Sequence, residues 1–188
     1  TRLLSPSDLR ARLARPLELL QRAGAGRHDS VRRVVLDSVE SLTAAARRLF
    51  GLSLLLRNGF TLQDAEAVLG AGLPGANILD AIDELVRTSL LRVQVDSSGP
   101  ARYAHFETIR DVAEQLVATD PARSSVLRAH CRHYATRASS PDLHADRELD
   151  NLLLAHETAT HLAEAERERE VAQDALTLAV GLEALLSA

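Results

Sequence analysis

The chain has 188 residues, enough for one large domain or two small ones, and 46% of them are hydrophobic, so it can bury a sizeable core. Its net charge of -4 argues against a general binder of nucleic acid or of membrane surfaces. The charge is uneven: residues 1–60 carry 11 arginines and 5 acidic residues, whereas residues 61–188 carry 11 arginines and 21 acidic residues. The two parts are therefore expected to face different partners or each other.

Cysteine content and apolar runs indicate the environment of the chain. Cys131 is the only cysteine, so the sequence excludes an internal disulfide and favours a cytoplasmic location. The longest apolar run falls far short of the roughly 20 residues that a membrane span needs, so no membrane contact is expected. Every basic residue is an arginine. Without a lysine, the chain cannot contain the phosphate-binding loop Gly-x-x-x-x-Gly-Lys-(Ser/Thr).

The first part of the chain is expected to contain two helical segments. Ser5–Asp8 is typical of a helix start. Pro16 interrupts the leucine stripe that follows, which predicts a kink or two short helices before Gly24–Gly26. Asp29-Ser30 is expected to cap a second helix, which ends at Ser41–Thr43. The side chains predicted to point inward from it are Val31, Val34, Val35 and Val39.

The middle of the chain changes from helical to strand periodicity. The expected elements are a helix from about 44 to 56, a turn at Asn58-Gly59, a short helix at 62–69 capped by Thr61, a loop at 70–75, and an amphipathic helix marked by Ile78, Leu79, Ile82, Leu85 and Val86. Residues 91–95 then alternate as a strand does, and residues 102–106 can run back as its partner. Three helices followed by a hairpin predict a mainly α fold: a winged helix-turn-helix with a small β-hairpin wing, flanked by helical segments.

The last part of the chain is predicted to be helical again. The expected segments are a helix at 108–118, a helix from Asp120-Pro121 to about 138, a linker at 139–141, and helices at about 147–166 and 170–187. No glycine or proline separates the last two helices. A single long helix is therefore the alternative to a helical pair.

Several segments resemble, in order, the winged-helix region of the bacterial STAND signalling ATPases, which are NB-ARC-like regulators with LuxR-type or antibiotic-regulator-type output domains. The resembling stretches are Arg27–Val31, Leu42–Phe50, Gly59–Val68, Leu79–Val93, Arg102–Ala113 and Glu148–Leu152. Gly59–Val68, for example, is close to the GFTLEAAEAV segment of that family. The resemblance covers nearly the whole chain, and the order and spacing of the segments carry it.

The resemblance implies three parts and a non-enzymatic role. Residues 1–27 resemble the end of the helical domain that follows the ATPase, residues 28–118 the winged-helix domain, and residues 119–188 the start of a tetratricopeptide-like arm. Such a segment would relay nucleotide state to sensing and output in a transcriptional or signalling regulator. The parent protein would bind ATP or ADP with magnesium, whereas this chain is expected to hold no cofactor. The implied partners are its own upstream ATPase domain and a protein or ligand sensed through the arm.

The resemblance also singles out residues at the end of the hairpin. In related plant and animal switches a Met-His-Asp motif lies there, and its histidine reaches the nucleotide phosphate. Here Phe106 stands in the histidine's place and cannot donate to phosphate, so only Glu107 is expected to contact nucleotide, and only beside an ATPase domain. The residues expected to pack between domains are Arg27, His28, Phe106 and Arg110. Strand alternation further predicts that Phe106 pins the hairpin to the following helix.

Two other function classes stay open. A DNA-binding winged-helix transcription factor with a helical dimerisation tail would have the same fold, and a pure protein-interaction scaffold is the third possibility. A DNA-reading helix needs donors near its start and basic residues against phosphates. The equivalent helix, Asn77–Thr88, is instead acidic, so DNA binding by this segment is not expected. Its charged residues are Asp80, Asp83, Glu84 and Arg87.

Metal binding and catalysis are the remaining interpretations. His130, Cys131 and His133 lie close together in the sequence. A zinc site needs about four ligands, however, and no second pair has a standard spacing. These three residues are therefore expected to be ordinary surface or half-buried side chains, with no metal. No nucleophile-elbow motif is present, so no catalytic residue is assigned.

Overall fold

The computed structural model describes residues 33–95, 99–138, 140, 145–166 and 169–186. The chain divides into two units, residues 1–40 and 41–188, and each is described by itself. The elements predicted before residue 33 lie outside the described residues. In the first unit residues 33–40 are helical, and Val34 is 64% exposed, so its predicted inward position is wrong. Val35 and Val39, four residues apart, share the buried side of this helix, and Val34 lies off that line.

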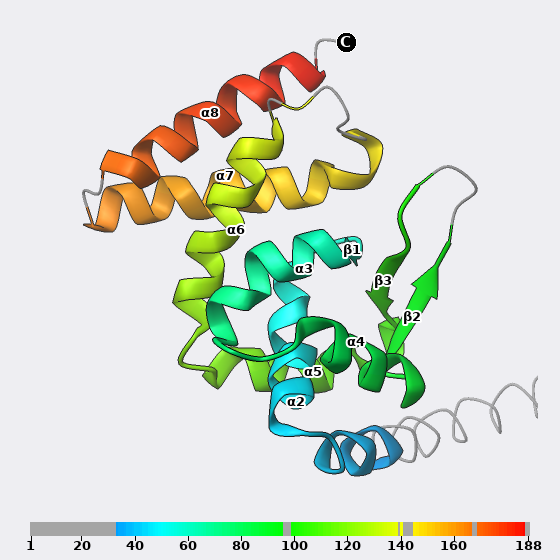
Figure 1. Cartoon of the computed structure of the whole chain (residues 1–188). Coiled ribbons are helices and arrows are strands. Elements are labelled where there is room, and N and C mark those ends of the chain that lie inside the picture. Colours follow the sequence, from blue (N-terminus) through cyan, green and yellow to red (C-terminus); the bar gives the residue numbers. More distant parts are fainter. Residues whose placement is uncertain (1–32, 96–98, 139, 141–144, 167–168, 187–188) are drawn as a thin grey trace, which may run out of the picture. The chain divides into compact units, whose positions relative to one another are not determined.

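The second unit is mainly helical with one small antiparallel sheet (Figure 1). Its helices are α2 (Ala44–Leu52), α3 (Leu62–Leu69), α4 (Ile78–Arg87), α5 (Arg110–Thr119), α6 (Arg123–Ala138), α7 (Ala145–Glu166) and α8 (Arg169–Leu186), with 3-10 turns at Ser53–Leu55, Gly70–Gly72 and Glu107–Ile109. Its strands are β1 (Phe60–Thr61), β2 (Leu91–Gln94) and β3 (Arg102–His105). The coarse prediction of a mainly helical chain with a small sheet is confirmed.

Capping residues set where α2, α3 and α4 begin. Thr43 and Asn77 accept hydrogen bonds from the first backbone N–H groups of α2 and α4, and the Thr61–Asp64 pair forms a capping box on α3. The predicted α3 boundaries are confirmed. The helix predicted to run to residue 56 instead ends at Leu52 and tightens into a 3-10 turn, in which Leu54 and Leu55 are buried.

The apolar stripe of α4 was predicted only in part. Ile78, Ile82 and Leu85 are buried at helical spacing, but Leu79 is 48% exposed. Leu79 comes one residue after Ile78, which turns it about 100° away from the buried face. Glu84 on the same helix accepts hydrogen bonds from the backbone and hydroxyl of Thr43, at 2.9 and 2.7 Å, and so fixes α4 against the start of α2.

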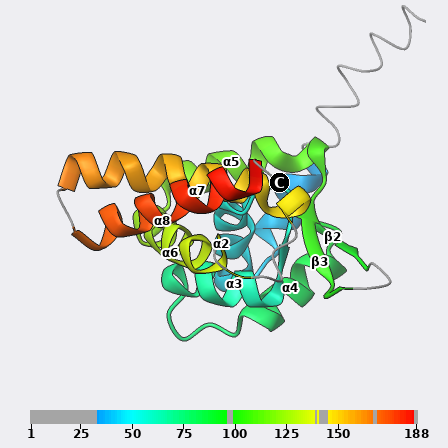
Figure 2. The ribbon, with the colours of Figure 1, turned by 90° about the horizontal axis from the view of Figure 1, so that it is seen from above.

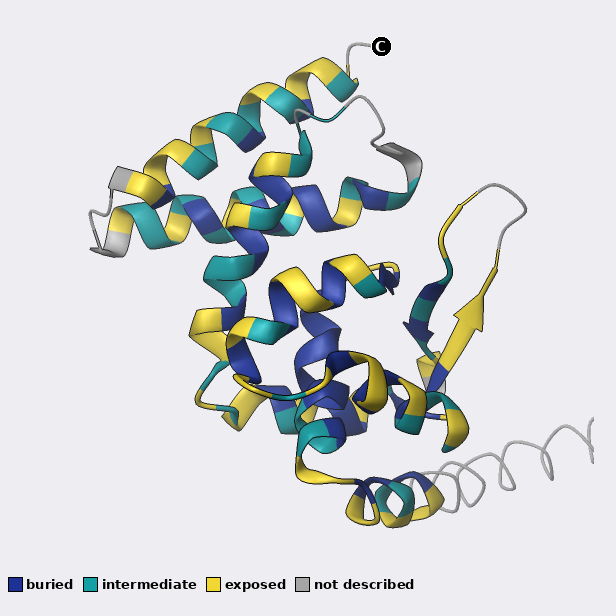
Figure 3. Cartoon of the chain, viewed as in Figure 1, coloured by how far each residue is buried: buried dark blue, intermediate teal, exposed yellow. Residues whose placement is uncertain are grey.

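The sheet contains one strand more than the predicted hairpin. The strand order is β1–β3–β2, with Phe60 opposite Tyr103 and Leu91 opposite His105. β1 is only two residues long, too short to show a period of two in the sequence. The predicted turn at Asn58-Gly59 leads into it, and both residues have positive φ, at 58° and 81°. β2 lies at the edge of the sheet and is mostly exposed (Figure 3).

Helices α6, α7 and α8 form the end of the unit, and two views show α7 and α8 running side by side in opposite directions (Figures 1 and 2). The alternative of one long helix is therefore wrong. Small residues let the helices approach closely: Ala155 and Ala159 are fully buried on α7, and a Cβ on Gly181 of α8 would lie 2.7 Å from the Cβ of Ala138. None of the described helices combines the length and the hydropathy that a membrane crossing requires.

Candidate functional site

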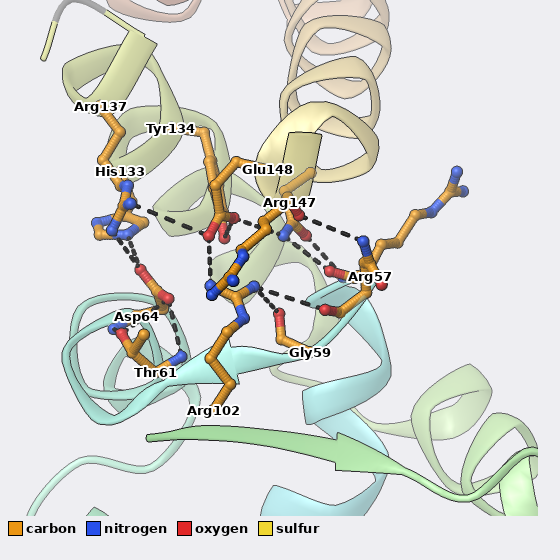
Figure 4. A network of polar contacts seen from close by, with 12 residues as sticks. Arg57, Gly59, Thr61, Asp64, Arg102, His133, Tyr134, Arg137, Arg147 and Glu148 are labelled. Carbon is orange, nitrogen blue, oxygen red and sulfur yellow. Dashed lines mark hydrogen bonds and ion pairs between the residues drawn. The ribbon is translucent and has the colours of Figure 1, made fainter. Parts of the chain in front are cut away.

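A group of buried and half-buried polar side chains lies where α3 and β3 meet α6 and α7 (Figure 4). We call it the junction network. It consists of Asp64, Arg102, His133, Tyr134, Arg137, Glu148 and Asn151. Buried polar groups are costly unless they are paired, so a cluster of this size has to be satisfied by specific contacts. Those contacts centre on two carboxylates, Asp64 and Glu148.

Asp64 belongs to the α3 capping box and is also bonded by α6. Its Oδ2 accepts from the backbone and hydroxyl of Thr61 at 2.9 and 2.8 Å. Its Oδ1 accepts from His133 Nε2 at 2.9 Å and from an Arg137 NH group at 3.0 Å. Burial alone would raise the pKa of Asp64, but the His133 and Thr61 hydrogen bonds and the Arg137 charge lower it to about 2. The carboxylate is therefore ionised, and His133 Nε2 carries the donated proton.

Glu148, in the first turns of α7, is the second centre. Its Oε1 accepts from Arg102 of β3 at 2.6 Å, and Arg102 also donates to the backbone oxygen of Gly59 at 2.9 Å. Its Oε2 accepts from Tyr134 of α6 at 3.1 Å and from Asn151 at 3.0 Å. Burial, together with the nearby carboxylates, raises the pKa of Tyr134. Tyr134 therefore stays a neutral donor at all ordinary pH values.

Asn151 also ties α7 to the segment before β1. Its side-chain amide accepts from Arg57 N at 2.6 Å and donates to Arg57 O at 2.8 Å, so it pairs with the backbone as a neighbouring strand would. Asn58 adds a longer bond, 3.4 Å, from its amide to the backbone oxygen of Arg147. The end helices are thus joined to the sheet side by backbone as well as by side chains.

A cavity of about 430 Å³ opens against the junction network. It is bounded by the start of α3, the residues leading into β3, the end of α6 and the start of α7. Its lining residues are Thr61, Gln63, Gly99, Pro100, Arg102, His133, Arg137, Ser140, Arg147 and Glu148. Three of the described lining residues are arginines, and two of them, Arg102 and Arg137, are bonded to the carboxylates of the junction network.

His130 is a buried histidine beside the junction network. It is fully buried, its ring packs against that of Tyr134 in a tilted arrangement with 4.6 Å between centroids, and neither ring nitrogen makes a hydrogen bond of standard geometry. Burial lowers the pKa of His130 to about 4, although the nearby Asn151 amide opposes that shift. His130 and Cys131 are both buried, so their predicted surface or half-buried position is wrong. The inner face of α6 contacts both α7 and α8, which leaves no solvent at these positions.

A second polar group surrounds His105 at the end of β3. Ser53 donates its single hydroxyl proton to Phe50 O at 3.0 Å, so His105 Nε2, 2.8 Å from that hydroxyl, is the donor to it. His105 Nδ1 is then an unprotonated acceptor, and it has no hydrogen-bond partner. Burial lowers the pKa of His105 to about 4, and the charge of Arg110 adds to this effect. A small hollow of about 160 Å³ lies here, lined in part by Arg92, Glu107 and Arg110.

The structure brings together only some of the residues predicted to act at this end of the sheet. Glu107 and Arg110 line the same hollow, with their charged groups 4.0 Å apart. Phe106 is 40% exposed, so the prediction that it pins the hairpin to the next helix is wrong. The chain turns into the 3-10 segment Glu107–Ile109 directly after Phe106, and Ile109, 5% exposed, fills the interior instead. Arg27 and His28 lie outside the described residues.

The described residues contain no group of histidine, cysteine and carboxylate side chains that could hold a metal ion. Both buried carboxylates of the junction network already accept hydrogen bonds from arginine and from neutral donors. Neither is placed as a spare base beside a nucleophile. The arrangement can hold the terminal helices against α3 and the sheet.

None of the junction carboxylates or their partners was identified from the sequence as site residues. Two signals were present: Thr61 and Asp64 have capping-box spacing, and Glu148 and Asn151 interrupt the apolar stripe of α7 at a spacing of three residues. The pairing of Asp64 with His133, 69 residues later, has no local signal.

These features define a mainly helical protein whose small sheet and terminal helices are joined by a buried ionic and amide network. A scan against models of protein families finds no match to this chain. Searches of curated proteins and of solved structures likewise return no match.

Proposed function

We propose that this chain is the non-catalytic relay segment of a STAND-type signalling ATPase, a transcriptional or signalling regulator. In this proposal residues 28–118 are a winged-helix domain that packs on an upstream ATPase domain. Residues 119–188 begin the arm that receives a signal. The parent protein would bind ATP or ADP with magnesium, and this segment would convert nucleotide state into arm position by protein–protein packing.

The order of the elements supports the winged-helix part of the proposal. Three helices, α2 to α4, precede the β2–β3 hairpin, and a short β1 between α2 and α3 adds to the far edge of β3. A winged helix-turn-helix has this order of helices and wing. The hydrogen bonds of Glu84 to Thr43 occupy the face of α4 that contacts α2.

The observation that carries the relay role is the junction network. Arg102 reaches from β3 to Glu148 of α7, and Asp64 of α3 is bonded to His133 of α6. A buried ion pair with this many additional donors favours one relative placement of the two parts, because any shift leaves a buried charge unpaired. A displacement of the arm would therefore move β3 and α3 with it, as a relay requires.

The exposed end of the hairpin supports an interdomain surface. Phe106 is a large apolar side chain left 40% exposed, next to the half-buried Arg110. In the proposal these residues pack against the ATPase domain together with Arg27 and His28. Glu107, whose side chain is almost fully exposed, would approach the nucleotide only in that assembly.

The sequence encoded immediately upstream tests the proposal most directly. A nucleotide-binding domain with a Gly-x-x-x-x-Gly-Lys-(Ser/Thr) loop is expected there. Calorimetry on the present chain should detect no binding of ATP or ADP, because the chain has no lysine for such a loop. An upstream domain of another class, or micromolar nucleotide binding by this chain alone, would contradict the proposal.

DNA binding by a winged-helix transcription factor is the alternative that the same element order favours. The charge of α4 weighs against it: Asp80 and Asp83 are exposed, and Arg87 is paired with Asp83 at 3.0 Å. Phosphate contacts would require the opposite charge on this helix. A low-salt mobility shift on a mixed-sequence duplex, lost on changing Arg87 or Arg92, would favour the transcription factor over the relay. A scaffold without an ATPase is distinguished by the upstream sequence.

A further inference from the structure

The outer edge of β2 is a free edge of the sheet. β3 pairs with one side of β2, and no other described strand pairs with the opposite side. The backbone N–H and C=O groups along such an edge can pair with a further strand, and proteins usually protect it with proline, a β-bulge or charged side chains. β2 and the residue after it, Val95, contain no proline and only one charged side chain, Arg92.

Apolar side chains continue from the covered part of the sheet out to this edge. Phe60, Tyr103 and Val93 lie side by side on one face of the three strands. Phe60 is fully buried, Tyr103 is half-buried and Val93 is 43% exposed, so the row becomes more exposed towards β2. Val95, two residues further along the same face, is 75% exposed. A strand added to β2 would cover both valines if it carried apolar residues at the matching positions.

The side-chain pattern of β2 is complementary to itself. β2 and the next residue read Leu-Arg-Val-Gln-Val, in which apolar and polar side chains alternate. When two copies of this stretch run antiparallel about a two-fold axis at Val93, that valine faces its own counterpart, and Val95 faces Leu91 of the second copy. On the other face, Arg92 lies opposite Gln94 of the second copy. Apolar residues thus meet apolar residues, and no side chain faces one of like charge.

The neighbouring symmetric registers fit less well. An axis at Arg92 would bring two guanidinium groups face to face, and like charges directly opposite each other destabilise a strand pair. An axis at Gln94 would leave Leu91 and Arg92 with no described residue opposite them. The axis at Val93 pairs the whole exposed stretch.

We propose that two copies of this chain associate through β2, by antiparallel pairing about Val93 that joins the three strands of each copy into one continuous sheet. Pairing of so short a stretch buries less than the roughly 1,600 Å² of a standard interface, so the association is weak and depends on concentration. The inference goes beyond the proposed relay function, because its argument uses only the sheet. The upstream sequence bears on the relay function alone, so the two proposals can fail separately.

Sedimentation equilibrium of the full chain tests the association. A monomer–dimer equilibrium with a dissociation constant between about 10 µM and about 0.5 mM is expected. A chain that stays monomeric throughout this range leaves the edge to a strand of another protein and overturns the proposal.

Two exposed positions of β2 give variants with opposite expected effects. Val93→Lys places two ammonium groups opposite each other and should weaken the dimer about tenfold or more. Gln94→Glu should tighten it roughly twofold to tenfold, because the new carboxylate faces Arg92 of the second copy twice in each dimer. The matched control is Val180→Lys, the same change at a 60% exposed position of α8, which should leave the dissociation constant unchanged. Circular dichroism establishes that each variant is folded.

Disulfide cross-linking tests the register directly. The only native thiol, Cys131, is buried, so it does not compete under mild oxidation. Val93→Cys should give a covalent dimer, because two directly opposite residues have the Cα separation that a disulfide needs. Gln94→Cys, one residue further along, should cross-link much less, because its counterpart is not the residue opposite.

Each remaining result also decides the proposal. Equal weakening by Val93→Lys and Val180→Lys would mean a general charge effect, and weakening by Val180→Lys alone would place the contact on α8; either overturns the assignment to β2. Weakening by Gln94→Glu, or preferential cross-linking of Gln94→Cys, overturns the pairing about Val93.

Discussion

Asp64 is the residue whose ionisation depends most clearly on the fold. It is fully buried, yet the donors from Thr61, His133 and Arg137 keep its carboxylate charged. His130, whose ring packs against Tyr134, shows the opposite response. Its ring nitrogens make no hydrogen bond of standard geometry, and burial lowers its pKa so that the imidazole stays neutral. The two residues illustrate how bonding to the charged form decides whether a buried group stays ionised.

The pKa of Asp64 predicts how acid destabilises the chain. It falls from 3.8 to about 2 on folding, so Asp64 contributes stability above pH 3.8 that is lost as the pH falls through about 2. The difference amounts to about 2 kcal/mol in the free energy of unfolding. Urea unfolding of the wild type and of Asp64→Asn should give a stability gap that is constant at neutral pH and narrows by that amount below about pH 4.

The comparison of the two proteins removes the contribution of His105. The folded-state pKa values of His105 and His130 are both lowered from 6.5 to about 4, so each histidine contributes stability that is lost as the pH falls from 6.5 towards 4. For His105 that loss is the same in the wild type and in the variant and cancels in the gap, whereas the Asp64 charge raises the pKa of His130, so the His130 contribution cancels only in part. If the difference in free energy of unfolding between the wild type and Asp64→Asn does not change with pH down to about 2, Asp64 is not held ionised as described.

At the scale of elements, the sequence was most informative where a cap marks a helix start. Thr61 and the stripe after it predicted α3 to the residue, and the acidic α4 was placed within one residue at its start. β1 escaped prediction because two residues carry no periodicity and their pairing with Tyr103 and Arg102 is long-range. The exposed Leu79 and Phe106 were misplaced for a related reason: local alternation does not show which side of an element another element covers.

Close packing of α6 on α8 predicts that Gly181→Ala is destabilising. The new Cβ would lie 2.7 Å from the Cβ of Ala138, so one helix has to move, at a cost of about 1–3 kcal/mol. Gly70→Ala is the matched control, because a Cβ there meets no atom within 4 Å and its backbone is already helical. Thermal unfolding should show a lower midpoint for the first variant and an unchanged or higher one for the second.

A compensating change distinguishes packing from helix propensity in that experiment. Combining Gly181→Ala with Ala138→Gly exchanges the methyl group between the two helices and should recover part of the loss. If the double variant is less stable than Gly181→Ala alone, the contact between α6 and α8 is not what limits this position.

At the scale of the whole second unit, the junction network connects segments that are far apart in the sequence. Arg57 is bonded to Asn151, 94 residues later, and Arg102 to Glu148, 46 residues later. The candidate site therefore arises only from the folded arrangement, which is why the sequence pointed to helices and caps but not to their polar partners. Replacing one residue of a bonded pair should therefore show how strongly the packing of the sheet and of the terminal helices depends on that pair.

A double-mutant cycle on Arg102 and Glu148 measures that dependence. Arg102→Met and Glu148→Gln should each destabilise the chain by about 3–5 kcal/mol, because each leaves a buried partner unpaired. The double variant should be more stable than the sum of the two losses implies, with a coupling of about 1–3 kcal/mol by urea unfolding. The control pair is Asp83 and Arg87, exposed at the surface of α4, whose coupling should be at most about 1 kcal/mol. Equal couplings for the two pairs would contradict the description of the network.

The burial of Cys131 makes its alkylation rate a measure of local opening in this unit. It is the only thiol in the chain, it lies on the inner face of α6 and donates to Ala155 O of α7 at 3.4 Å, and burial raises its pKa to about 12. The thiolate attacks an alkylating reagent, and in the native state this thiolate is both scarce and buried. The rate of labelling therefore depends on how often α6 and α7 separate enough to expose the thiol. A single mass-spectrometric time course would report the free energy of that opening at one known position.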